Sequence, residues 1–137
     1  MKILATILTA AMILTGSLVS TNKKTITATV VNVTSDSGKV SFALYNKDNF
    51  MKVPLQAKNG KIVEGKSTVV FEDVEPGDYA IICFHDKNNN DKMDFQPSGM
   101  PMEDYGASNN IMSFGPPTYS NSKFTVSEKD LTLEIKF

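Results

Sequence analysis

Residues 85–94 (HDKNNNDKMD) form the stretch of the chain whose residue types and spacing are best suited to chemistry. Side-chain oxygens stand at alternate positions from Asp86 onward, and a hard cation such as Ca²⁺ takes about six to eight oxygen ligands. A loop that turns every second side chain inward supplies such ligands, with a backbone carbonyl filling the gap at Lys92. We therefore predict a calcium site. Its ligands are Asp86, Asn88, Asn90, Lys92, Asp94 and Glu103.

Residues 86–94 resemble the first part of an EF-hand-type loop, D-x-N-x-N-x-x-x-D. Two positions depart from that pattern: Asp91 stands where the sharp turn has Gly, and Pro97 stands where the bidentate Glu should be. We expect a calcium loop grafted between strands rather than an EF-hand, closed by a carboxylate at Glu103 or Asp104. With so few carboxylates the dissociation constant should be about 10⁻⁴–10⁻³ M, which suits calcium only outside the cytoplasm.

Two other interpretations of this loop stay open. In the first, the Asn and Asp side chains cap their own backbone in a metal-free turn, as these residues commonly do. In the second, His85, the sole histidine, is a general base oriented by Asp86, with Ser98 or Ser108 as the nucleophile of a hydrolase. Neither a nucleophile elbow nor a pair of zinc ligands accompanies His85, so we expect a protein without catalytic activity.

The elements that must position this loop are short segments of alternating or β-branched apolar residues, separated by turn sequences rich in Gly, Pro, Asn and Asp. No segment has the period of a long helix. The chain is therefore predicted to be all-β, a single antiparallel β-sandwich of about seven strands. The expected strands cover residues 24–34, 39–45, 61–63, 67–74, 79–85, 123–126 and 131–137.

Residues 86–117 form a long polar segment without clear period, and loops of this length in small domains are usually functional or held in place by something. The apolar residues within it have two interpretations. They either cover the open end of the sandwich as part of the core or form an exposed patch for a partner. We expect core, because a short chain needs its apolar residues for burial. The residues concerned are Met100, Met102, Tyr105, Ile111, Met112 and Phe114.

The start of the chain has the layout of a secretory signal peptide: Lys2 is followed by the almost wholly apolar residues 3–19 and then by ordinary soluble sequence. We predict a signal peptide over residues 1–20 and one domain over residues 21–137, exported to the periplasm or the cell exterior and without a membrane span after cleavage. A retained N-terminal anchor is the alternative, because the apolar run approaches the roughly 20 residues of a membrane span.

Composition narrows the range of partners. Every basic residue is Lys, and without residues 1–20 the chain carries 13 Lys against 15 Asp and Glu, a net charge of −2. Nucleic-acid recognition relies on Arg and on a basic surface, so we expect no nucleic-acid partner. Cys83 is the only cysteine, which excludes an intramolecular disulfide, and its apolar neighbours predict a buried thiol.

Four blocks of sequence follow one another in an order that is typical of one family. They are FEDVEPGDYAI (71–81), HDKNNNDKMD (85–94), GMPMEDYGASNN (99–110) and GPPTYSNSKFTV (115–126). From residue 24 to residue 137 the chain resembles DUF2141, a bacterial domain family of unknown function. The resemblance implies export, a prealbumin-like sandwich of immunoglobulin-like or transthyretin-like topology, and no assigned activity. We expect a binding or structural module at the cell envelope with a protein or carbohydrate ligand.

Overall fold

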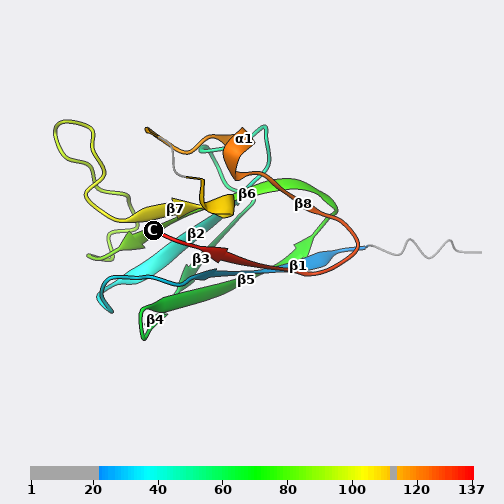
Figure 1. Ribbon diagram of the computed structural model, residues 1–137, viewed down its shortest axis with the longest axis horizontal. Coiled ribbons are helices and arrows are strands. Elements are labelled where there is room, and N and C mark those ends of the chain that lie inside the picture. The colour runs from blue at the N-terminus through cyan, green and yellow to red at the C-terminus, as the bar shows by residue number, and fades with distance from the viewer. Residues whose placement is uncertain (1–21, 112–113) are drawn as a thin grey trace, which may run out of the picture.

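Alternating apolar residues build two β-sheets that pack face to face (Figure 1). The computed structural model describes residues 22–111 and 114–137, so the signal peptide predicted over residues 1–20 lies outside the described residues. The strands are β1 (Lys24–Val30), β2 (Lys39–Tyr45), β3 (Gln56–Gly60), β4 (Ile62–Val63), β5 (Lys66–Val74), β6 (Gly77–Asp86), β7 (Tyr105–Ala107), β8 (Phe124–Val126) and β9 (Leu131–Ile135). A 3₁₀ turn, η1 (Ser108–Asn110), and a short helix, α1 (Tyr119–Ser122), complete the elements. In this part of the chain no helix has the length and apolar character needed to cross a membrane.

One sheet has the strand order β4-β5-β1-β9, and the other has the order β3-β2-β6-β7 with β8 also paired to β6. All pairs are antiparallel except β1 and β9, which run parallel. The predicted all-β sandwich is confirmed, with nine strands among the described residues in place of about seven. The two additional strands, β3 and β7, are short and polar or glycine-containing, so they lack the apolar alternation that marks the others.

The facing sides of the sheets bury a single apolar core. Alternate residues of β2 and β6 pack against alternate residues of β1, β5 and β9. The largest fully buried apolar side chains are Phe42, Phe71, Ile26, Leu44, Ile81 and Ile135. Cys83 is fully buried among them, as predicted, and burial raises the pKa of its thiol well above the usual range. The thiol therefore stays protonated and acts as a packing group.

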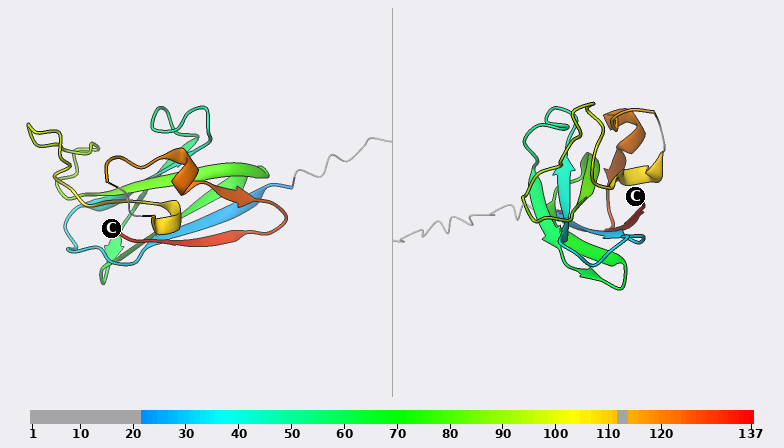
Figure 2. Two further views of the ribbon diagram at one scale, coloured as in Figure 1. Left: turned by 45° about the horizontal axis from the view of Figure 1, so that its top comes forward. Right: turned by 90° about the vertical axis from the view of Figure 1, so that its left-hand side faces the viewer.

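Between β6 and β7 the chain leaves the sandwich and projects from the end at which Phe137 terminates the chain (Figure 2, yellow-green). This excursion, residues 87–104, is a narrow hairpin. The N–H of Met102 donates to the C=O of Asp94 at 2.8 Å, and the N–H of Gln96 donates to the C=O of Met100 at 2.8 Å. The two arms of the hairpin therefore lie side by side, which brings the residues after Met102 next to the Asn-rich loop.

Candidate metal centre

The candidate calcium loop begins with Asp86, the last residue of β6, whose side chain is completely buried. Its carboxylate accepts two backbone N–H groups from further along the loop. Oδ1 lies 3.1 Å from the nitrogen of Asn90, and Oδ2 lies 2.9 Å from the nitrogen of Asp91. The side chain of Asp86 therefore closes the turn, because its carboxylate holds the backbone four and five residues downstream.

The backbone of the turn is left-handed at two positions, Asn89 (φ 55°) and Asp91 (φ 62°). Asn and Asp enter this region more readily than other non-glycine residues, because their short polar side chains can bond locally. Asp91 occupies the position that has Gly in an EF-hand-type loop, and it adopts the conformation that Gly would supply there. This departure from the pattern therefore preserves the sharp turn.

Asn88, Asn90 and Asp94 face one another across the turn. The Nδ2 of Asn88 donates to the Oδ2 of Asp94 at 2.9 Å, and the Nδ2 of Asn90 donates to Oδ1 of Asp94 at 2.8 Å. The two amide oxygens accept backbone N–H groups instead. Asn88 Oδ1 accepts from Asn90 at 3.3 Å, and Asn90 Oδ1 accepts from Lys92 at 3.0 Å. The alternate side chains of the loop thus meet at the half-buried Asp94, as the spacing predicts.

Of the two carboxylates expected to close the site, Glu103 is the one that faces the loop. It is 7% exposed, and its Oε2 lies 3.5 Å from the backbone nitrogen of Asp94. Asp104 turns the other way: its Oδ2 accepts the hydroxyl hydrogen of Thr34 at 3.1 Å and lies 3.7 Å from the Nζ of Lys87. The hairpin decides between them, because side chains on successive extended residues point to opposite sides.

Five of the six predicted ligand residues are thus brought into one hydrogen-bonded network, and they are Asp86, Asn88, Asn90, Asp94 and Glu103. The sixth, Lys92, joins it through its backbone N–H, whereas the prediction used its carbonyl. Within residues 22–111 and 114–137, no three His, Cys, Asp or Glu side chains are grouped so that they could hold a metal ion. A cation here would therefore depend on amide and backbone oxygens as well as on carboxylates.

The amide groups of the two asparagines determine whether the loop can present those oxygens. Each has its nitrogen toward Asp94 and its oxygen toward a backbone N–H. An Asn amide has nearly the same shape when it is turned by half a revolution. This rotation of the two amide groups places both amide oxygens beside the carboxylate of Asp94 without moving the backbone. Four oxygens in that arrangement, two from the amides and two from the carboxylate, repel one another unless a cation lies among them, so this rearrangement fits a hard cation.

Lys39, on β2, is a charged neighbour of the loop that the sequence analysis did not identify. The antiparallel register places it opposite Asp86, with its Nζ 3.9 Å from Oδ2 of Asp86. The same ammonium group donates a hydrogen bond to Asp91, and this bond is the main cause of the raised pKa of Lys39. Only the pairing of β2 with β6 reveals this contact, because the residues are far apart in the sequence.

His85 and Ser108, two residues of the hydrolase alternative, each bond to the backbone rather than to one another. His85 is fully buried on the core side of β6, and its Nε2 lies 2.7 Å from the carbonyl oxygen of Ser37. Ser108 is also buried, and its hydroxyl contacts the backbone of Ile81 and Ser122. Neither set of contacts gives the bond between base and nucleophile that such an enzyme uses.

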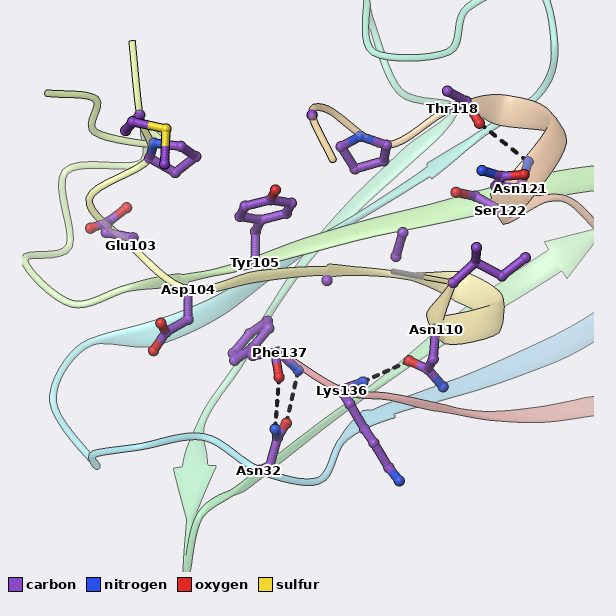
Figure 3. Close-up of a pocket in the computed structure, with 17 residues that line it drawn as sticks. Asn32, Glu103, Asp104, Tyr105, Asn110, Thr118, Asn121, Ser122, Lys136 and Phe137 are labelled. Atoms are coloured by element: carbon purple, nitrogen blue, oxygen red, sulfur yellow. Dashed lines mark hydrogen bonds between the residues drawn. The ribbon is translucent and has the colours of Figure 1, made fainter. Parts of the chain in front are cut away.

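A hollow of about 570 Å³ lies beside the hairpin, bounded by β7, the residues before it and the segment that leads into α1 (Figure 3). The expectation that the apolar residues of this region form core is wrong for four of them. Met100, Met102, Ile111 and Phe114 are all more than half exposed. Met100 and Met102 are exposed because they lie on the hairpin that projects from the end of the sandwich (Figure 2). Tyr105 is partly buried, and Met112 lies outside the described residues.

Comparison with known proteins bears on the family and not on the activity. No curated protein and no solved structure matches the chain. Residues 28–134, which include most of both sheets and the whole excursion, match the model of DUF2141, described as an uncharacterized protein conserved in bacteria. This match confirms the resemblance that the four sequence blocks indicate. The chain therefore belongs to the DUF2141 family.

Proposed function

We propose that this protein is an exported, non-catalytic binding or structural module of the cell envelope whose excursion is held in place by a calcium ion. The observation that carries the proposal is the convergence of the oxygen-bearing side chains of residues 86–94 with Glu103. Calcium would be held by the carboxylates of Asp94 and Glu103, by the two turned amides and by backbone oxygens. The carboxylate of Asp86 would orient the turn around the ion.

A metal-free turn is the second candidate, and a specific observation favours it. The oxygens of Asp86, Asn88 and Asn90 already accept backbone N–H groups, and Asp94 already accepts the two amide groups. Asn and Asp side chains commonly satisfy a turn in this way. In this case the excursion has the same stability with and without calcium.

Thermal unfolding with about 5 mM CaCl₂ and with EDTA separates the two candidates. For a dissociation constant of about 0.1–1 mM, calcium should stabilise the protein by about 1–2 kcal/mol, which raises the midpoint by several degrees in a domain of this size. We expect Asp94→Asn to abolish the rise, because it removes a ligand charge at nearly constant shape.

Asp91→Asn is the matched control for this experiment. Asp91 lies in the same loop, but its carboxylate is largely exposed and faces Lys39 rather than Asp94. The control variant should keep the calcium response. Equal midpoints in calcium and in EDTA for the unsubstituted protein would contradict the calcium proposal and leave the metal-free turn.

A second expected result concerns Lys39, whose ammonium group lies 3.9 Å from Oδ2 of Asp86 and repels a cation in the loop. Lys39→Met should tighten calcium binding by about two- to fivefold at low salt, a small factor because the ammonium group is partly exposed and is screened by water and salt. Isothermal titration at two salt concentrations measures the change. Lys58→Met, on the exposed face of β3, is the control and should have no effect. Weaker binding by the Lys39 variant would contradict the assignment of the cation to this loop.

A further inference from the structure

The hairpin ends in an exposed apolar tip, residues 95–102 (FQPSGMPM). Three large apolar side chains lie on it and are more than half exposed: Phe95 (57%), Met100 (62%) and Met102 (60%). Single exposed apolar residues are common on protein surfaces, but several together mark a surface that meets a partner or a membrane. The tip stands clear of the sandwich, because the hairpin projects from the end at which Phe137 terminates the chain (Figure 2).

The apolar side chains of the tip occupy both faces of the hairpin. Phe95 and Pro101 form an antiparallel pair, so their side chains lie on one face. Met100 and Met102 precede and follow Pro101, and successive residues of an extended strand point to opposite sides. The two methionines therefore lie on the other face. A protein surface on which the hairpin lies flat covers one face and leaves the other in water, whereas a lipid layer surrounds both.

The charges of the hairpin are layered in the same order as those of a lipid bilayer. No residue of the tip is charged, and Asp94 and Glu103 flank it directly. The C=O of Asp94 accepts the N–H of Met102, so the charges begin at the same level on both arms. Lys87 and Lys92 follow on the same hairpin, so its base carries both signs. This arrangement complements a bilayer, whose charged headgroups lie outside an uncharged layer.

The length of the tip also fits a lipid surface. Three residues separate Asp94 from the turn, which is about 10 Å at about 3.3 Å per residue. Segments that lie in a bilayer interface bury their apolar side chains to a depth of about 5–10 Å. The turn is also largely paired, because the N–H of Gly99 donates to the C=O of Gln96 and the N–H of Gln96 donates to the C=O of Met100, both at 2.8 Å. Few unpaired backbone donors would enter the lipid.

We propose that the tip inserts into the surface of a phospholipid bilayer with zwitterionic headgroups and holds the sandwich against it. Phe95 enters from one face of the hairpin, and Met100 and Met102 enter from the other. The charged groups at the base stay at the level of the headgroups. The inference rests on the proposed binding role at the cell envelope and not on the calcium ion, because backbone hydrogen bonds give the tip its shape.

A fluorescent label on the turn tests insertion directly. The Ser98→Cys variant is labelled with a fluorophore that responds to polarity and is titrated with vesicles of phosphatidylcholine and phosphatidylethanolamine, in EDTA and again in calcium. Cys83 is fully buried and should not take the label. We expect a saturable blue shift and a rise in emission of at least about twofold, because the label leaves water for the bilayer interface. Emission that does not change with lipid overturns the proposal.

A label at the other end of the sandwich is the control. Ser127 is exposed in the connection between β8 and β9, and Asp130 of that connection accepts the N–H of Thr25 at the start of β1. The labelled Ser127→Cys variant should not respond to vesicles. An equal response at both positions, or a response at Ser127 alone, would show that another part of the chain brings the protein to the lipid, and it would overturn the proposal.

Two substitutions test the two faces of the tip, each in the chain labelled at Ser98→Cys. Phe95→Ser and Met100→Ser change exposed side chains, so both variants should fold, and each should weaken vesicle binding by about fivefold or more. Val53→Ser is the matched control, because it removes a 78% exposed apolar side chain from the connection between β2 and β3. It should leave binding unchanged. Unchanged binding by either tip variant overturns insertion of both faces.

Failure of this proposal can be told apart from failure of the calcium proposal. The calcium response is measured as an unfolding midpoint without lipid, whereas the label reports lipid in EDTA as well as in calcium. A rise of the midpoint in calcium without a response of the Ser98→Cys label would keep the calcium site and remove the lipid contact. A response of the label with equal midpoints in calcium and in EDTA would do the reverse.

Discussion

Asp86→Ala should lower the free energy of unfolding by about 2–3 kcal/mol, in EDTA as well as in calcium. The carboxylate is fully buried and accepts the backbone N–H groups of Asn90 and Asp91. Alanine leaves the N–H of Asp91 without a partner and the N–H of Asn90 with only the Oδ1 of Asn88 at 3.3 Å, and an unsatisfied group that water does not reach costs about 1–3 kcal/mol. Urea unfolding measures the effect as a lower midpoint at unchanged slope.

Asp94→Ala is the control for this prediction. Asp94 is half-buried and accepts side-chain amides that can turn to water, so its loss in EDTA should cost less than about 1 kcal/mol. Asp86→Asn keeps one acceptor oxygen and should fall between the two alanine variants. A destabilisation of Asp86→Ala that appears only in calcium would contradict this account, because it would make the residue a metal ligand alone.

Asp86 and Asp94 therefore differ in how directly their substitution tests the calcium proposal. Because Asp86 accepts two backbone N–H groups of the turn, its removal disturbs the loop whether or not a metal binds there. The carboxylate of Asp94 accepts only side-chain amides, so its isosteric replacement tests the ion more directly. The residue that most resembles the first ligand of a calcium loop is therefore the less informative one to change.

The main strands could be predicted from the sequence because each has a buried face. Apolar alternation marks β1, β2, β5, β6 and β9, and the predicted ranges overlap all of them. β3 and β7 lack that alternation. Their backbone pairing with β2 and β6 holds them in place, rather than the burial of their side chains. Every residue except proline has the same backbone donor and acceptor, so pairing of this kind leaves little trace in the sequence.

In the candidate site, too, the contacts between residues close in the sequence could be predicted, and the contacts between distant segments could not. The alternate oxygens of residues 86–94 are close in sequence, and the local turn brings them together as predicted. The choice of Glu103 over Asp104 and the contact of Lys39 with Asp86 depend on how distant segments pair. The exposure of Met100 could not be predicted from the sequence either, because a hydrophobic residue in a small domain is usually needed for the core.

Gly38 lies in the connection before β2 and contacts the start of the loop, and Gly38→Ala should lower the free energy of unfolding by about 2–5 kcal/mol. Gly38 has φ +75°, and a Cβ there would lie 2.0 Å from the carbonyl oxygen of Asp86 and 2.8 Å from the Cα of Lys87. The left-handed backbone costs a non-glycine residue about 1–2 kcal/mol. The clash adds about 1–3 kcal/mol, because it must displace backbone rather than a flexible side chain.

Gly65→Ala separates these two contributions, because Gly65 has nearly the same backbone angle, φ +74°, and far more space. The nearest atom to its Cβ would be the carbonyl oxygen of Val33 at 3.3 Å. This variant should lose only the about 1–2 kcal/mol of the left-handed backbone, so the difference between the two glycines in urea unfolding measures the contact at Asp86. Equal losses would mean that the backbone at the start of the loop moves without cost. In that case Asp86 could not hold the turn rigidly, and the fixed placement of Asn88, Asn90 and Asp94 around the proposed ion would be lost with it.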